Sequence, residues 1–169
     1  MSLNSRPFLF AVLLTTLLAL TGIAMSDEHE PAHRVSVPDA EDLQADAALA
    51  RANGIPILLV VTQHYCGFCE TLKDEVIRPM ILSGDYDDRV LIRELVSDDR
   101  GGVRDFDGVK RDAGDIARRY RAWLTPTLVF LGPDGQQLQD NIRGVNTLDY
   151  YSYYVDEAIA AARKRVGGG

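Results

Sequence analysis

The sequence predicts an α/β fold in which helices cover both faces of a mixed central sheet. Apolar, β-branched runs typical of buried strands alternate with segments of helical periodicity. Farther along, two short strand patterns flank Gly132-Pro133-Asp134-Gly135, a connection too short for a parallel crossover. These two strands must be antiparallel, so the sheet combines both strand directions.

The first predicted helix runs from an N-cap at Asp39 to a C-terminal glycine at Gly54. Its apolar face consists of Leu43, Ala47, Ala48 and Ala52. Residues 55–62 then form a continuous apolar run, which predicts a strand buried on both faces.

A second helix and strand follow. The helix carries Leu72, Val76 and Ile77 on its apolar side, and Pro79 is expected to end or kink it. A strand is predicted over residues 90–96, and the polar, glycine-rich residues 97–112 are expected to form a loop or insertion.

The C-terminal part is predicted as a short helix over 115–122, strands over 128–131 and 136–143, and a helix over 147–166. Gly144 breaks the pattern before the last helix. The apolar side of that helix is expected to contain Tyr150, Tyr151, Tyr154, Val155, Ala158, Ile159 and Ala162.

Composition restricts the function. The 169 residues are 46% hydrophobic and 25% charged, as expected for one globular domain. The net charge is −7 without a basic stripe, which argues against a nucleic-acid partner. The two cysteines are too few for a disulfide framework or for the four ligands of a structural zinc site.

The N-terminus has the layout of a secretory signal peptide over residues 1–24. Arg6 precedes an apolar run over 8–20, and small residues permit cleavage after Ala24 or after Ser26. The alternative is an uncleaved membrane anchor, since the uncharged stretch is about as long as a bilayer requires. Either reading exports the chain. Residues 25–38 are then expected to be a flexible tether, 39–166 the folded domain and 167–169 a disordered tail.

Cys66 and Cys69 are the candidate catalytic residues. They follow a predicted buried strand and open a helix, so Cys66 lies where the helix N-terminus stabilises a thiolate. Cys69 lies one turn later on the same face and can attack a mixed disulfide formed at Cys66. Cys66 should be the more exposed of the two. Gly67 is expected to permit a tight turn and Phe68 to cover the sulfurs. The alternatives are a structural disulfide or half of a metal site.

Two neighbouring residues have open interpretations. His64, two residues before Cys66, either lowers the thiolate pKa as a cation or is an exposed loop residue. Trp123 either lines a substrate groove, packs against the domain or is a surface anchor.

Together these features resemble the thioredoxin superfamily. Tyr65-Cys66-Gly67-Phe68-Cys69 is similar to its active-site motif, Thr125-Pro126-Thr127 to its cis-proline loop, and Gly144 to the glycine before its last helix. Asp105-Phe106-Asp107-Gly108 further resembles an insertion in periplasmic SoxW-type thioredoxins.

The resemblance implies a thioredoxin-like fold and a thiol–disulfide oxidoreductase with Cys66 as nucleophile and Cys69 as resolving cysteine. Pro126 would be cis, although residue statistics alone favour trans. Phe68, Thr125, Pro126 and Gly144 would form the substrate groove, with a substrate chain pairing along Thr125 as an added strand.

The resemblance also implies protein disulfides as substrates, a membrane electron donor, a periplasmic location and no organic cofactor or metal. A reductase is favoured. An oxidase or isomerase, a non-enzymatic binding module and a Cu(I) metallochaperone remain alternatives, and a monomer is the default. The chain departs from cytosolic thioredoxins at Val60, where those proteins have a buried acid, and in its Gly-Phe dipeptide.

Overall fold

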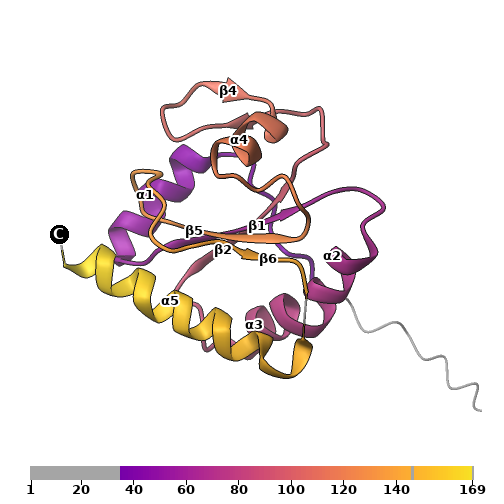
Figure 1. Ribbon diagram of the computed structural model, residues 1–169. Helices are drawn as coiled ribbons and strands as arrows, with labels where there is room; N and C mark the ends of the chain where they lie inside the picture. The colour runs from indigo at the N-terminus through magenta and orange to yellow at the C-terminus, as the bar shows by residue number, and fades with distance from the viewer. Residues whose placement is uncertain (1–34, 146, 169) are drawn as a thin grey trace, which may run out of the picture. The chain divides into compact units, whose positions relative to one another are not determined.

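The computed structural model describes residues 35–145 and 147–168, which form a four-stranded mixed sheet with helices on both faces (Figure 1). The strand order is β2-β1-β5-β6. Strand β2 is parallel to β1, whereas β5 is antiparallel to both β1 and β6. The strands are β1 (Ile57–Thr62), β2 (Leu91–Val96), β5 (Thr127–Leu131) and β6 (Ile142–Arg143). The predicted fold class is confirmed.

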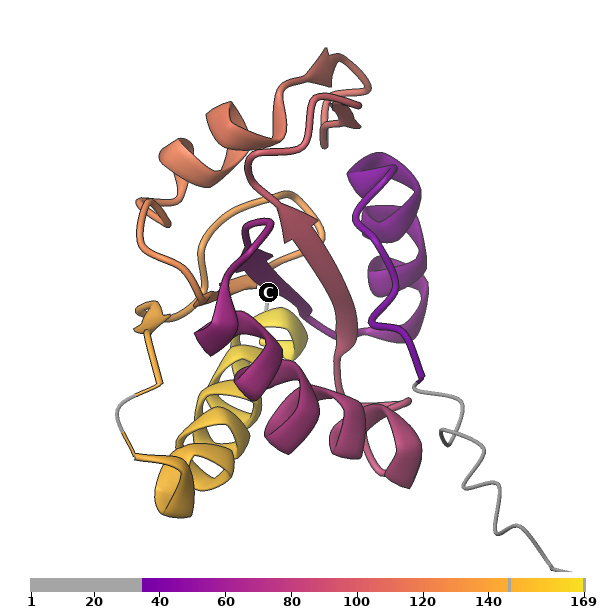
Figure 2. The ribbon, with the colours of Figure 1, turned by 90° about the vertical axis from the view of Figure 1, so that its right-hand side faces the viewer.

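The two faces of the sheet are covered by different helices (Figures 1 and 2). Helices α1 (Leu43–Asn53) and α4 (Ala113–Arg119) lie on one face. Helices α3 (Arg78–Ser83) and α5 (Tyr151–Gly167) lie on the other.

Alternation along β1 divides the core into two clusters. Leu58 and Val60 join the cluster that contains the α5 residues, while Leu59 and Val61 join the cluster that contains the α1 and α4 residues. Because all six residues of β1 are buried, the apolar run in the sequence is explained by burial on both faces.

The helix that begins after Cys66 runs past Pro79 without ending. It consists of α2 (Gly67–Leu72), a π-helical turn η1 (Lys73–Ile77) and α3. Pro79 lacks the N–H that an α-helix requires at this position, and the preceding π turn, in which the Arg78 N–H donates to the Lys73 carbonyl, accommodates it. The helix therefore does not end at Pro79, and the irregularity in it is the π-helical turn that precedes the proline.

The predicted loop over residues 97–112 contains a small hairpin of β3 (Val103–Arg104) and β4 (Lys110–Arg111). Its centre is Asp105, whose side chain is 2% exposed. The Asp105 carboxylate accepts hydrogen bonds from Arg111 (2.7 Å) and from Arg119 of α4. The insertion is thus anchored to the domain by a buried carboxylate.

Several predicted boundaries were wrong at the N-terminal end. Helix α1 begins at Leu43 with Asp42 as its N-cap, whereas Asp39 forms an isolated β-bridge with Glu94 of β2. Packing begins before Asp39, because Val37 is only 5% exposed. Residues 35–38, the part of the predicted tether that the structure describes, therefore belong to the folded domain. The rest of the predicted tether and the predicted signal peptide lie outside the described residues.

The C-terminal part also differs in detail. The predicted strand over 136–143 is reduced to β6. Gln137 forms an isolated bridge with Leu131 and the Leu138 N–H donates to the Phe130 carbonyl, but residues 139–141 belong to no strand. A 3-10 turn, η2 (Leu148–Tyr150), precedes α5. Tyr150 and Tyr154 are exposed rather than buried. Helix α5 includes Gly167, and Gly169 lies outside the described residues.

Replacing Asp105 with Asn should destabilise the domain by about 2 kcal/mol, since two arginines lose their buried counter-charge. Urea unfolding at pH 7 measures this. Burial alone would raise the pKa of the Asp105 carboxyl, but the bonds and charges of Arg119 and Arg111 outweigh it and lower the pKa. The stabilisation of the fold by the Asp105 carboxylate is therefore present above about pH 4 and is lost as the pH falls below that value.

The matched control is Asp107→Asn. Asp107 pairs with the same Arg111, but its side chain is 55% exposed, so the change should cost much less stability than Asp105→Asn. Equal losses for the two variants would contradict the role given to Asp105.

Candidate active site

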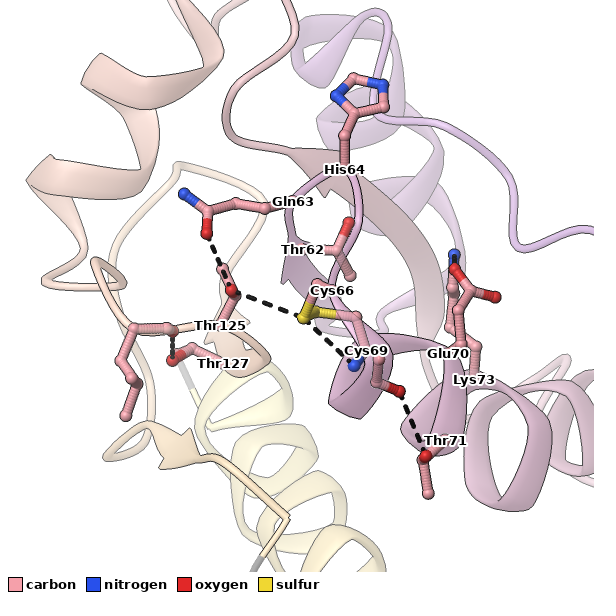
Figure 3. The surroundings of a disulfide bond; sticks show 12 residues. Thr62, Gln63, His64, Cys66, Cys69, Glu70, Thr71, Lys73, Thr125 and Thr127 are labelled. Carbon is pink, nitrogen blue, oxygen red and sulfur yellow. Dashed lines mark hydrogen bonds and ion pairs between the residues drawn. A yellow bond between two sulfur atoms is a disulfide. The ribbon is translucent and has the colours of Figure 1, made fainter.

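The cysteine pair lies where β1 gives way to α2 (Figure 3). The two sulfurs form a disulfide of 2.05 Å. Cys66 is the N-cap of α2, and its Sγ accepts a hydrogen bond of 3.2 Å from the Cys69 N–H. A thiolate at Cys66 would occupy the same position, where the free N–H groups of the first turn favour an anion.

The two cysteines differ in exposure as predicted. Cys69 is 1% exposed, whereas Cys66 is partly exposed at the surface. An incoming disulfide can therefore reach the sulfur of Cys66 and not that of Cys69, which fits the division into nucleophile and resolving thiol.

The proline loop lies directly beside Cys66. The Thr125–Pro126 peptide bond is cis, and Thr125 Oγ1 lies 3.7 Å from Cys66 Sγ. The Thr125 hydroxyl donates to Gln63 Oε1 (3.1 Å), which ties the proline loop to the loop before Cys66 (Figure 3).

Gly144 belongs to the same surface. Its N–H donates to the Pro126 carbonyl at 2.8 Å, and its φ of +69° is one that a residue with a side chain rarely adopts. The structure thus brings Cys66, Thr125, Pro126 and Gly144 together from three separate segments.

Exposed apolar side chains surround this site. They flank the cysteines and the proline loop: Tyr65 (107% exposed), Phe68 (69%), Trp123 (68%) and Leu124 (53%). The side chains of Phe68 and Trp123 are both largely exposed, so Trp123 is not packed in the core. Grouped exposed aromatics are typical of surfaces that bind other proteins.

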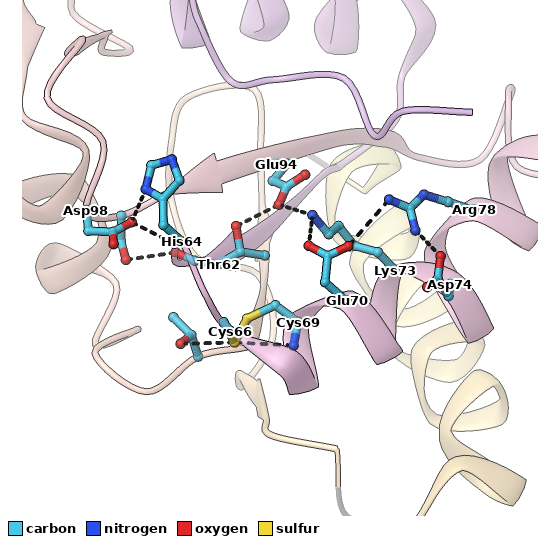
Figure 4. Close-up of polar contacts among 12 residues, drawn as sticks. Thr62, His64, Cys66, Cys69, Glu70, Lys73, Asp74, Arg78, Glu94 and Asp98 are labelled. Atoms are coloured by element: carbon cyan, nitrogen blue, oxygen red, sulfur yellow. Dashed lines mark hydrogen bonds and ion pairs between the residues drawn. A yellow bond between two sulfur atoms is a disulfide. The ribbon is translucent and has the colours of Figure 1, made fainter. Parts of the chain in front are cut away.

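The structure decides between the two interpretations of His64, which is an exposed loop residue, and it changes the role of Gly67. The His64 ring turns away from the sulfurs, and its Nδ1 lies 3.0 Å from Asp98 Oδ1 (Figures 3 and 4). Gly67 is helical, and a Cβ there would meet no atom within 4 Å, so the turn does not require glycine. The left-handed residue is Tyr65, with φ of +56°.

A buried polar cluster lies beside the helix that follows Cys66, and sequence reasoning did not identify Glu94 as its centre. Glu94 of β2 accepts hydrogen bonds from Thr62 (2.7 Å) and Lys73 (3.0 Å), and Lys73 also bonds Glu70 (2.9 Å) (Figure 4). The available signal was a single carboxylate within the otherwise apolar end of a strand, residues 94–96. Local periodicity could not show which helix would supply its partner.

Within residues 35–145 and 147–168, no three His, Cys, Asp or Glu side chains are grouped so that they could hold a metal ion. None of the helices in the same residues is long and apolar enough to cross a membrane.

The comparison that decides the family covers most of the domain: residues 43–159 match the thioredoxin-like domain. The chain belongs to the thioredoxin-like family. No curated protein matches the sequence.

Solved thioredoxin-fold structures agree in fold. A thioredoxin from Thermus thermophilus is 20% identical, with a TM-score of 0.54, and the match covers 76% of this chain and 90% of that one. The DsbH oxidoreductase is 15% identical, with a TM-score of 0.55 and coverage of 77% and 88%. A thioredoxin-like domain with Cys66 and Cys69 at disulfide distance is consistent with thiol–disulfide oxidoreductase chemistry.

After reduction, iodoacetamide should modify Cys66 at least tenfold faster than Cys69, because only Cys66 is accessible and lies at the helix N-terminus. Fragmentation mass spectrometry of the peptide that contains both residues measures the ratio. The preference should vanish in urea, where both thiols are exposed. Faster modification of Cys69 in the folded protein would reverse the assignment of the two roles.

Proposed function

We propose that this protein is an exported thiol–disulfide oxidoreductase that reduces disulfides of periplasmic proteins. The observation that carries the proposal is the asymmetric cysteine pair, with an accessible sulfur at a helix N-terminus and a buried partner one turn away. In the reaction, the Cys66 thiolate attacks a substrate disulfide, and the Cys69 thiolate then displaces the substrate and closes the Cys66–Cys69 bond.

The substrates are proteins that offer an extended segment next to a disulfide. Such a segment would pair with the backbone at Thr125 as an added strand, with the cis-proline loop and Gly144 as the floor of the groove. The exposed side chains of Tyr65, Phe68 and Trp123 would add apolar contact with little dependence on substrate sequence.

The proposal also covers the direction of electron flow, the electron donor and the subfamily. A reductase must be re-reduced, and outside the cytosol a membrane thiol-reducing protein is the donor that fits. The anchored insertion around Asp105 supports a place among the SoxW-type thioredoxins. The protein acts as a monomer without cofactor, whereas isomerases usually need a dimerising domain. An oxidase is the second candidate because the Gly-Phe dipeptide leaves the redox poise open.

The first test uses insulin as a disulfide substrate. The reduced wild-type protein should accelerate insulin reduction, Cys66→Ser should abolish the acceleration, and Cys69→Ser should accumulate a mixed disulfide through Cys66. Non-reducing electrophoresis and mass spectrometry detect the complex. A complex formed by Cys66→Ser through Cys69 would contradict the mechanism, and activity unchanged by Cys66→Ser would favour a binding module.

The same reduced protein, equilibrated in thiol buffers, determines the direction. A reduction potential near that of thioredoxin, about −270 mV, supports a reductant, whereas about −120 mV would identify a disulfide donor.

Export gives a separate prediction. Protein recovered from the periplasmic fraction should begin at Met25 or Asp27, and placing an arginine in the apolar run, as in Leu14→Arg, should keep the full chain in the cytoplasm. N-terminal sequencing of each fraction measures this. A full-length chain in the membrane fraction would replace cleavage by anchoring.

A further inference from the structure

A pocket of about 530 Å³ opens beside β6, the edge strand of the sheet (Figure 1). Its walls come from three parts of the chain: the end of α4, residues 137–143 and the last turn of α5. None of the residues assigned to the candidate active site lines this pocket. The thiol–disulfide exchange proposed above therefore leaves it unused.

The lining of the pocket is strongly basic. Arg121, Arg143 and Arg165 line it, and Asp140 supplies the one carboxylate among the described lining residues. The chain as a whole has a net charge of −7, so the sign of the charge at this pocket is opposite to that of the protein. Cations gathered around one hollow repel one another, and their combined field attracts an anion.

The three guanidinium groups are not neutralised by the protein itself. Most of the other arginines that the structure describes are paired with a carboxylate. Within the same part of the chain, the side chains of Arg121 and Arg143 have no such partner. Arg165 donates to the Leu138 carbonyl, an uncharged acceptor that does not neutralise it. The positive charge of the pocket is therefore available to a ligand.

The backbone of Arg121 is strained. Arg121 follows the C-cap of α4 with φ of +55°, in the left-handed region where glycine is the usual residue after a helix. A residue with a side chain pays a conformational cost there, and residues held in this way are concentrated at binding and active sites. The group that this strained residue places at the pocket is a guanidinium.

Amide side chains hold the walls of the pocket together. Asn141 Nδ2 donates to the Tyr120 carbonyl at 2.8 Å, which joins the residues before β6 to the end of α4. Gln137 Nε2 donates to Asn141 Oδ1 and to the Gln139 carbonyl, each at 2.8 Å. The pocket is thus formed before any ligand binds, which lowers the cost of ordering it on binding.

We propose that this pocket binds a small organic anion that carries at least two phosphate or carboxylate groups. A planar guanidinium forms paired hydrogen bonds with either group, so the two kinds of ligand share one recognition chemistry. Three arginines serve two such groups, and the Asp140 carboxylate weakens the attraction without cancelling it. The volume is in the range of small-molecule sites. The inference goes beyond the proposed redox function and does not depend on it.

The test measures binding of pyrophosphate and of citrate to the full chain, or to its cleaved mature form, by isothermal titration calorimetry. Metal-free buffers at constant ionic strength exclude effects of chelation and of salt. The wild-type protein should bind at least one probe with a Kd below about 1 mM. Tighter binding of pyrophosphate would assign phosphate groups to the ligand, and tighter binding of citrate would assign carboxylates. Failure of both probes to bind would overturn the proposal.

Two substitutions test the arginines separately. Arg121→Gly and Arg143→Gln should each weaken binding of the better probe by about tenfold or more, since each removes charged hydrogen bonds. Arg121→Gly is the sharper variant because glycine adopts a φ of +55° without strain. The melting temperature of the ligand-free variant should therefore be unchanged or raised while its affinity falls, which separates loss of the site from damage to the fold.

Lys164→Gln is the matched control. Lys164 is an exposed cation next to Arg165 in α5, but it does not line the pocket. Its replacement removes the same charge and should leave the affinity within about twofold of the wild-type value. Equal weakening in the control and the arginine variants would show general attraction to positive charge and would overturn the proposal. Unchanged affinity in either arginine variant would overturn it as well.

Discussion

Strand β1 lies between β2 and β5 with all six of its residues buried, so it supplies both faces of the hydrophobic core. Such a strand has no polar face that would tolerate a shift in register. Its end point is therefore fixed by packing, and the chain leaves the sheet at Gln63 and turns into α2 within a few residues. The position of Cys66 at the helix N-terminus is a consequence of this burial.

The same constraint positions the rest of the site. Strand β5 is held antiparallel against β1, so the residues just before Thr127 reach the same edge of the sheet as Cys66. Pairing of β5 with β6 then places Gly144 on the Pro126 carbonyl. Strand pairing therefore brings three segments that are distant in sequence to the same edge of the sheet.

Features with strong local signals could be predicted from the sequence. The buried strand over 55–62, the cysteine pair and the order of elements required only periodicity and motif spacing. The predictions were wrong where contacts between residues distant in sequence determine the local structure. Asp39 fits the pattern of a helix cap but pairs with β2, and residues 139–141 fit a strand pattern but belong to no strand of the sheet. Tyr65 rather than Gly67 takes the left-handed conformation, although glycine is the residue that favours it.

The Lys73–Glu94 pair illustrates why part of the site was not predictable. A lysine on a helix and a glutamate on a strand carry no sequence signal that they will meet. Their meeting is also poorly explained by stability, because replacing a buried ion pair with apolar residues of similar volume is often neutral or stabilising. The surrounding core of Val60, Leu72 and Val76 shows that the fold can bury apolar side chains in this region. The needs of the core therefore do not by themselves account for this charged pair, of which Lys73 lies one helical turn after Cys69.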